Sequence, residues 1–275
     1  MRSDYHVHTC YSDDSDYPME QVVRDAIIMG LEELCITDHV DYGVKADWDA
    51  PLEERCRLPV RNVNYPAWFR ELSRLREQYQ EQITLKSGME FGVQTHTIPR
   101  FQALFQRYPF DFILLSCHQA EDLEFWNQDF QRGKSQAEYN LRYYEELLWV
   151  TQHFDDYSVL AHLNLIRRYD EQGDYPFRKV RPLVEELLKT AISHGKGIEL
   201  NTSCFRYGLA DLTPSWEILR LFRSLGGEII TIGSDSHAPG QLGAGVVEAQ
   251  RLLRELGFRW HCTFEAMQPT FHPLL

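Results

Sequence analysis

The sequence predicts an α/β fold, a barrel of the TIM kind with seven strands, from two observations. Short apolar segments alternate with amphipathic helical segments along the 275 residues, an order typical of parallel α/β sheets. Residues that can bind metals recur directly after most of the apolar segments, as they do at the catalytic face of a barrel. A doubly wound open sheet is the alternative, but no Gly-rich nucleotide motif or P-loop favours it.

The first strand is expected at 5–7, within the stretch DYHVHTCYSDD. His6 and His8 are two residues apart, so a strand would project both imidazoles from one face. A carboxylate-rich loop that contains Asp14 follows them. Alone this pattern is weak evidence for a metal site, because a chain with this histidine content contains about 0.4 H-x-H pairs by chance.

The other strands are predicted from short apolar runs of the kind that forms buried parallel strands. In chain order the seven strands cover 5–7, 33–37, 83–91, 111–115, 158–161, 197–201 and 228–233. Two segments between them are expected to be irregular. One is the polar loop 40–64, which is long enough to cover a substrate site, and the other is 119–135.

The helices are predicted from apolar residues spaced three or four apart. They span 19–30, 66–80, 100–107, 136–153, 180–194, 214–225 and about 249–256. Pro66 and Pro214 stand where a first helical turn tolerates proline, and Gly30 and Gly226 stand in C-cap positions. No linker or internal repeat divides the chain, so residues 1–275 are expected to form one domain.

The composition restricts the partners of the protein. The formal net charge is −13, which argues against a nucleic-acid-binding surface because phosphate contacts need clustered Lys and Arg. The six cysteines have no C-x-x-C spacing, which indicates reduced thiols in the cytoplasm. No apolar run approaches the ~20 residues of a membrane span, and the N-terminus has no signal pattern. We therefore expect a cytoplasmic protein that does not enter the membrane.

Nine polar residues lie at the carboxyl ends of predicted strands. They are His6, His8, Asp38, His39, Glu90, His118, His162, Asp235 and His237. Each alone also fits a structural role, such as a helix N-cap for Asp38 or a hydrogen-bonded core histidine for His118. Their coincidence at the ends of six strands is not expected from such roles and predicts a polynuclear metal site.

The motifs that carry these residues resemble the PHP (polymerase and histidinol phosphatase) family. They are DYHVHT and SDDS near the N-terminus, TDH at 37–39, GME at 88–90, SCH at 116–118, AHLNLIRRY at 161–169 and GSDSH at 233–237. Within the family, NTSCFR at 201–206 and HLNLIRRY resemble the stand-alone histidinol-phosphate phosphatases. The resemblance extends over nearly the whole chain.

The resemblance implies a distorted TIM-like (β/α)7 barrel that holds two to three divalent ions of Zn, Mn or Fe at the carboxyl ends of its strands. It assigns four ligands to one ion, namely His6, His8, Glu90 and Asp235. Glu90 would bridge to a second ion held by His118 and His162. The third ion would be held by Asp14, His39 and His237, although some family members have a histidine in place of Asp14.

The implied activity is hydrolysis of L-histidinol phosphate, in histidine biosynthesis, by a metal-bridged hydroxide. Arg206 and one of the pair Arg167 and Arg168 are expected to bind the phosphate and stabilise the transition state. Asp38 is expected to orient His39 or to share in proton transfer.

The acidic loop 40–54 suggests a basis for specificity. We expect Asp41, Asp47 and Asp49 to help bind the ammonium and imidazole end of the substrate, because they follow His39 in the chain.

Three alternatives compete with this activity. The first is another phosphoester, such as a nucleotide or the 3′ end of DNA, although the acidic charge argues against DNA. The second is a non-catalytic metal-binding protein of the same fold, which would have broken ligand positions, whereas all positions are filled. The third is deamination of the amidohydrolase type, which the motif spacing and the two arginine positions disfavour. A small phosphorylated substrate is therefore the expected partner.

Overall fold

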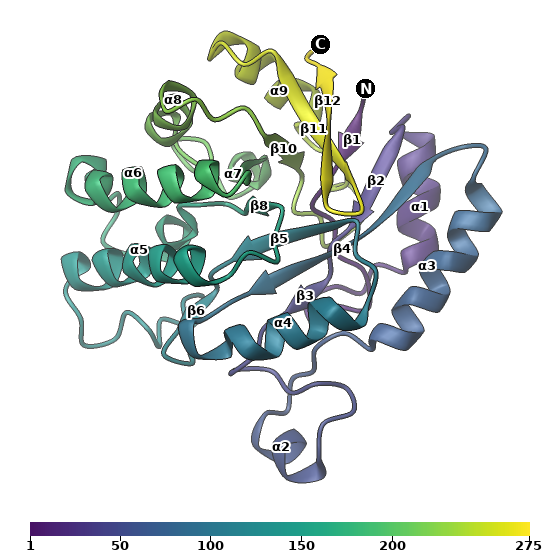
Figure 1. The fold of residues 1–275 in the computed structure, drawn as a ribbon. Helices are drawn as coiled ribbons and strands as arrows, with labels where there is room; N and C mark the ends of the chain where they lie inside the picture. The colour runs from purple at the N-terminus through teal and green to yellow at the C-terminus, as the bar shows by residue number, and fades with distance from the viewer.

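In a computed structural model that describes residues 1–275, a parallel sheet of seven strands curves into a nearly closed barrel (Figure 1). In their hydrogen-bonded order the strands are β1 (Ser3–Asp4), β2 (Glu33–Ile36), β4 (Thr84–Gly92), β5 (Phe112–Ser116), β8 (Val159–Leu160), β9 (Gly197–Asn201) and β10 (Ile230–Gly233). Beyond β1 the chain continues along β10, where Tyr5 N donates to Ile232 O over 3.0 Å and Val7 pairs with Ser236. The two edges of the sheet therefore meet, which confirms the barrel and excludes the open sheet.

Helices cover the outside of the barrel (Figure 1). The longer ones are α1 (Met19–Ile28), α3 (Tyr65–Tyr79), α4 (Ile98–Arg107), α5 (Gln136–His153), α6 (Phe177–Ser193), α8 (Trp216–Ser224) and α9 (Val246–Glu255). All seven were expected, and the proline predicted to open α3 lies in its first turn, where Asn64 caps Ala67 N. No helix combines the length and the apolar content that crossing a membrane would need.

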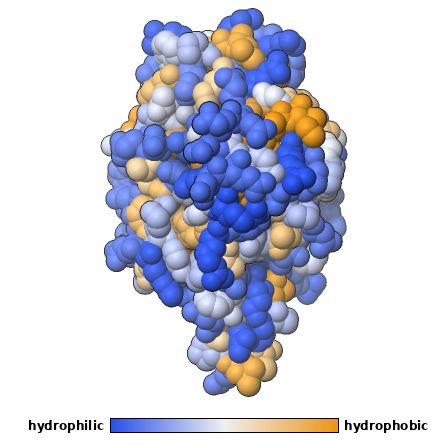
Figure 2. Space-filling view, turned by 90° about the vertical axis from the view of Figure 1, so that its right-hand side faces the viewer, coloured by the Kyte–Doolittle hydropathy of each residue, from blue (hydrophilic) through white to orange (hydrophobic).

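The helices are amphipathic, as their sequence spacing requires. In α1 a single stripe is buried against the sheet, and it contains Met19, Val22, Val23 and Ala26. Viewed from the side of α1 and α3, the molecular surface is mainly hydrophilic (Figure 2). Burial of the apolar stripes therefore fixes how the helices pack on the barrel.

A C-terminal hairpin that the sequence did not predict closes the amino-terminal end of the barrel. Its strands β11 (Trp260–Glu265) and β12 (Gln268–Pro273) pair antiparallel. Cys262 and Phe264 of β11 pack against Tyr5 and Phe112 in a small apolar cluster that is separate from the main core. The hairpin leaves the carboxyl ends of the strands as the open face of the barrel.

Several shorter elements lie at that open face. They are β3 (His39–Val40), α2 (Leu52–Arg57), the 3₁₀ turns η1 (Thr95–Thr97) and η2 (Leu165–Tyr169), the hairpin β6 (Gln119–Ala120) with β7 (Leu123–Glu124), and α7 (Ser203–Arg206). The segment 40–64, expected to be irregular, projects from the barrel as an arm that contains α2 (Figure 1). The segment 119–135, also expected to be irregular, begins with the β6–β7 hairpin.

Candidate metal centre

The carboxyl ends of the strands bring all nine predicted metal ligands together. Potential ligand atoms lie within 4.8 Å of one another in four overlapping groups: His8, Asp14, His39 and His237; His6, His8 and Asp235; His6, Glu90 and His162; and His39, Glu90 and His118. Seven of the nine line a pocket of about 440 Å³, and the other two, His6 and His8, are completely buried.

Glu90 lies at the centre of the cluster, near the carboxyl end of strand β4. One of its carboxylate oxygens, Oε2, lies 3.2 Å from His6 Nε2 and 3.4 Å from His8 Nε2. The other, Oε1, lies 3.0 Å from His118 Nε2 and 2.7 Å from His162 Nε2. Two ligands of one ion at bonds of ~2.1 Å are separated by about 3.0–3.5 Å. The carboxylate therefore fits a bridge between two ions.

A second carboxylate organises the outer part of the cluster. Asp14 Oδ2 lies 3.4 Å from His39 Nε2 and 3.2 Å from His237 Nε2. Register explains the place of His39, because β3 pairs His39 directly with Glu90 of β4. The spacing in this group also fits ligands that share an ion.

Several ligand atoms are buried without any hydrogen-bond partner. They are His6 Nε2, His8 Nε2, His39 Nδ1 and Glu90 Oε2. Buried polar atoms are nearly always paired, because an unpaired one carries the full cost of its lost hydration. A cation among them would supply the missing partner. The mixture of imidazole nitrogen and carboxylate oxygen suits Zn, Mn or Fe.

Protons hold the cluster together when no metal is bound. Burial lowers the pKa of His118, but the carboxylates of Glu90 and Asp41 outweigh it and raise this pKa to about 9. Burial raises the pKa of Glu90, yet the surrounding imidazoles, His6 first, lower it well below its usual value. Metal binding would therefore displace a proton from His118.

Buried partners fix the orientation of the ligand histidines. Glu199 Oε1 lies 2.6 Å from His6 Nδ1, and Asp41 Oδ1 lies 2.8 Å from His118 Nδ1. A carboxylate at Nδ1 holds the proton there and leaves Nε2 free for a metal. Sequence analysis missed Glu199, although a carboxylate inside the apolar strand GIELN was a signal for it.

Two of the ligand residues have strained backbones. His162 and Asp235 have φ angles of 26° and 56°, in a region that residues with a side chain rarely adopt. Asp235 is held there because its N donates to His6 O over 2.8 Å and its O accepts from Arg206 Nη2 over 2.7 Å. Strain that the neighbours impose is typical of functional sites.

Arg168 is the arginine that lines the pocket. Its Nη2 donates to Ser203 Oγ over 2.7 Å and to Asp235 Oδ2 over 3.1 Å, and its guanidinium lies 4.2 Å from the ring centre of Tyr207. Its Nε is buried with no partner. A fixed guanidinium with a free N–H beside the cluster can bind an oxyanion.

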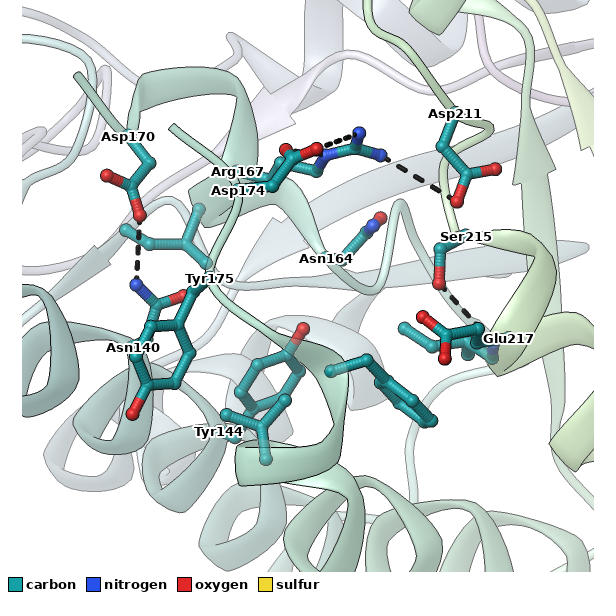
Figure 3. Close-up of a pocket in the computed structure, with 14 residues that line it drawn as sticks. Asn140, Tyr144, Asn164, Arg167, Asp170, Asp174, Tyr175, Asp211, Ser215 and Glu217 are labelled. Atoms are coloured by element: carbon teal, nitrogen blue, oxygen red, sulfur yellow. Dashed lines mark hydrogen bonds and ion pairs between the residues drawn. The ribbon is translucent and has the colours of Figure 1, made fainter. Parts of the chain in front are cut away.

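The other two predicted arginines do not line this pocket. Arg167 points into a separate cavity of about 110 Å³, where its Nη2 donates to Asp174 Oδ2 over 2.8 Å (Figure 3). Arg206 donates to the backbone oxygens of Ser234 and Asp235. Of the three predicted arginines, therefore, Arg168 alone lines the pocket. Arg206 lies behind Asp235, where it contacts the backbone.

Comparison with known proteins places the chain in a family. The model of the PHP domain matches residues 4–203, a range that contains ten of the predicted site residues. The chain belongs to the PHP family. The resemblance found in the sequence motifs is confirmed.

Two relatives and a solved structure resemble nearly the whole chain. A histidinol-phosphatase of Lactococcus lactis subsp. lactis (strain IL1403) is 30% identical, covering 96% of this chain and 95% of the relative. A probable histidinol-phosphatase of Thermotoga maritima is 26% identical, covering 94% and 93%. The crystal structure of histidinol phosphate phosphatase from Lactococcus lactis, complexed with zinc, L-histidinol and phosphate, has a TM-score of 0.84 at 29% identity and covers 98% of both chains.

Asp38, predicted to orient His39 or to share in proton transfer, lies behind the ligands rather than in the pocket. It is completely buried and does not line the pocket. Its carboxylate accepts hydrogen bonds from Thr9 N at 2.6 Å, Ser12 Oγ at 2.8 Å and Trp68 Nε1 at 2.8 Å. Ser12 Oγ in turn accepts from His39 N over 3.0 Å. The Asp38 carboxylate therefore reaches His39 through Ser12, and a direct part in proton transfer does not fit its position outside the pocket.

Of the three acidic residues of the arm predicted to bind substrate, only Asp41 lines the pocket. Asp41 lines the pocket, but its oxygens lie 2.8 Å from His118 Nδ1 and 2.9 Å from Lys45 Nζ. Asp47, which accepts from Tyr65 Oη over 3.0 Å, and Asp49 do not line the pocket. The prediction that these carboxylates bind the amine does not fit Asp47 and Asp49, which lie outside the pocket, whereas Asp41 lines the pocket but already pairs with His118 and Lys45.

Proposed function

We propose that this chain is a metal-dependent phosphomonoesterase that hydrolyses L-histidinol phosphate to L-histidinol and phosphate, a reaction of histidine biosynthesis. The observation that carries the proposal is a cluster of nine metal-ligand candidates, seven of them lining one pocket, beside an arginine with a free N–H in that pocket. The Lactococcus lactis structure, with its zinc, L-histidinol and phosphate, is similar over 98% of this chain and supports the same substrate here.

The proposed metal content is two to three divalent ions of Zn, Mn or Fe. The first ion would be held by His6, His8, Glu90 and Asp235, the second by Glu90, His118 and His162, and the third by Asp14, His39 and His237. When bound, such ions supply Lewis-acid charge and lower the pKa of a coordinated water enough to make it a nucleophile near neutral pH.

The remaining chemistry belongs to side chains of the protein. Arg168 presents Nε to the phosphate, and its contacts with Ser203 and Asp235 keep the guanidinium in place without induced movement. Glu199 and Asp41 hold the Nδ1 protons of two ligand histidines, so these imidazoles stay oriented through the reaction. We assign Asp38 and Arg206 to positioning: the first supports residues 9–12, and the second supports the backbone of Asp235.

A small phosphorylated substrate fits the pocket and the charge of the molecule. The cavity of about 440 Å³ is within the size range of small-molecule sites. The net charge of −13 disfavours nucleic acid, because long-range repulsion acts on a polyanion. We also propose that the protein works in the cytoplasm, where its cysteines, all of them free, would stay reduced.

Phosphate release from L-histidinol phosphate tests the proposal. Protein reloaded with Zn or Mn should release phosphate, and both a chelator and Glu90→Ala should abolish the release. Turnover of an aryl phosphate without turnover of L-histidinol phosphate would contradict the substrate but keep the phosphatase chemistry. Absence of turnover on both, in protein with metal bound, would contradict the enzyme assignment.

A further inference from the structure

One carboxylate in the active-site pocket, that of Glu124, has no cationic partner. Glu124 is half-buried, lines the pocket and forms no ion pair. The other five carboxylates that line the pocket each face a ligand imidazole or a lysine: Asp13, Asp14, Asp41, Glu90 and Asp235. The substrate proposed above carries an ammonium group, and Glu124 is the acidic group still available for it.

A second unpaired acceptor lies beside Glu124. In the β6–β7 hairpin Gln119 pairs directly with Glu124, so both side chains leave the same face. Gln119 Nε2 donates to Gly92 O over 2.9 Å, and this leaves Gln119 Oε1 as a buried acceptor without a donor. Because an ammonium group has three N–H donors and no acceptor, it would satisfy both side chains.

The position of the hairpin suits the geometry of an aminoalkyl phosphate. The hairpin starts one residue after His118, and Phe125 N donates back to His118 O over 3.1 Å. The Gln119–Glu124 pair is therefore adjacent to the metal-ligand cluster. In L-histidinol phosphate the amine is on the second carbon from the ester oxygen, so it must lie just outside the phosphate position.

The hairpin is held rigidly by its surroundings. Glu121 and Asp122, at its turn, have φ angles of 60° and 58°, which a two-residue turn of this kind requires but non-glycine residues adopt at a cost. The buried side chain of Gln94 donates to Asp122 Oδ1 and accepts from Asp122 N, each over 2.8 Å. This pair of bonds fixes the turn and, with it, the distance between Glu124 and His118.

We propose that Glu124 binds the ammonium group of the substrate, with Gln119 Oε1 as the second acceptor, and so gives the enzyme its preference for aminoalkyl phosphates. This inference rests on the proposed function and names the part of the site that selects the substrate. Asn127 Nδ2 donates to Glu124 Oε2 over 3.1 Å, which orients the carboxylate and leaves Oε1 for the ligand. A charged pair enclosed by the pocket is strong because the surrounding dielectric is low.

A matched pair of substrates tests the proposal. 2-Aminoethyl phosphate and 2-hydroxyethyl phosphate are of similar size and differ in an ammonium against a hydroxyl group. The measurement is the ratio of their kcat/KM values with zinc-loaded protein, so any general loss of turnover cancels. Glu124→Gln should lower this ratio about 10- to 100-fold, the effect expected of a charge-assisted hydrogen bond.

Glu121→Gln is the control, because Glu121 belongs to the same hairpin but pairs with Arg142 over 3.0 Å and does not line the pocket. It should keep the wild-type ratio. An unchanged ratio in Glu124→Gln, or an equal fall in Glu121→Gln, would overturn the proposal.

Failure of the proposed function is a separate result. If wild-type protein does not hydrolyse L-histidinol phosphate but prefers the aminoethyl ester through Glu124, the substrate is wrong and the amine site stands. If it hydrolyses L-histidinol phosphate and Glu124→Gln keeps the wild-type ratio, the function stands and the amine site is wrong.

Discussion

Replacing Glu199 with glutamine tests whether the carboxylates behind the ligand histidines control metal binding. Glu199 Oε1 lies 2.6 Å from His6 Nδ1, and Oε2 accepts from His162 N over 2.9 Å and from Asn201 Nδ2 over 3.2 Å. Glutamine has the same shape but only one oxygen. It therefore cannot accept all three of these hydrogen bonds.

Each orientation of the new amide has a defined cost. With the amide oxygen toward His6, the NH2 group faces two donors, His162 N and Asn201 Nδ2. With the NH2 group toward His6, the imidazole must move its proton to Nε2, the nitrogen that faces Glu90 Oε2 at 3.2 Å. A protonated Nε2 cannot bind a metal. A buried donor left unpaired costs about 1–3 kcal/mol, which corresponds to a loss of zinc affinity of roughly 5- to 150-fold at ~1.4 kcal/mol per factor of ten. Measured effects of such outer partners, about 10- to 100-fold, lie in the same range.

Zinc affinity is measured by competition with a chelator of known affinity, and urea unfolding of the metal-free protein reports the effect on the fold. Glu33→Gln is the matched control, because Glu33 is also buried but bonds to Tyr5 Oη, away from the pocket. The control should change unfolding without changing zinc affinity. If Glu199→Gln binds zinc as tightly as wild type, or no more weakly than Glu33→Gln, the assignment of Glu199 as a positioning residue is refuted.

Three further outcomes are expected. Arg168→Ala should lower kcat/KM for any phosphomonoester about 10- to 100-fold, because it removes a charged N–H donor at the phosphate. Arg167→Ala should keep a kcat/KM near that of wild type. Equal effects of the two substitutions in phosphate-release assays would contradict the assignment of Arg168 alone to the phosphate. Burial raises the pKa of Asp111, but N–H groups, Ser87 N first, outweigh it and lower the pKa below 3.8. A lowered pKa stabilises the fold above pH 3.8, so Asp111→Asn should cost about 1.5–3 kcal/mol at pH 7, and urea unfolding should show the gap closing as the pH falls through the folded-state pKa. Zinc binding at pH 7 should release about one proton or more, because the pKa of His118 is raised to about 9. Calorimetry in buffers of different ionisation enthalpy measures the number of protons released. A heat of binding that does not depend on the buffer would contradict this prediction.

The metal-ligand candidates could be found from sequence because the barrel places the ends of all its strands on one face. Glu90 in β4, His118 after β5 and His162 after β8 are far apart in the chain, yet parallel pairing of neighbouring strands sets them side by side. Residue type and position after a strand were then enough to group them. The barrel itself was predicted from the alternation of short apolar segments with helical segments along the chain.

The β6–β7 hairpin and the directions of the side chains in the 3₁₀ turn η2 could not be predicted from position after a strand. The β6–β7 turn is formed by Glu121 and Asp122, not by the Asn-Gly or Gly residues that announce such turns, and it depends on Gln94 from another part of the chain. Arg167 and Arg168 are neighbours in sequence, but in the 3₁₀ turn η2 successive side chains point about 120° apart. One therefore enters the pocket and the other leaves it, which spacing in the sequence could not decide.

The carboxylates of the pocket illustrate what only the fold can assign. Asp41 and Glu124 are both acidic residues near ligand histidines, and sequence reasoning selected the first for the substrate and ignored the second. Packing reverses this, because Asp41 faces His118 Nδ1 and Lys45 whereas Glu124 faces no cation. A carboxylate opposite Nε2 can share a metal ion with that imidazole, one opposite Nδ1 orients the ligand, and one that faces no cation can bind a cationic substrate. The role of each acid thus follows from the atom it faces, and that atom is set by strand register and hairpin pairing rather than by the residue itself.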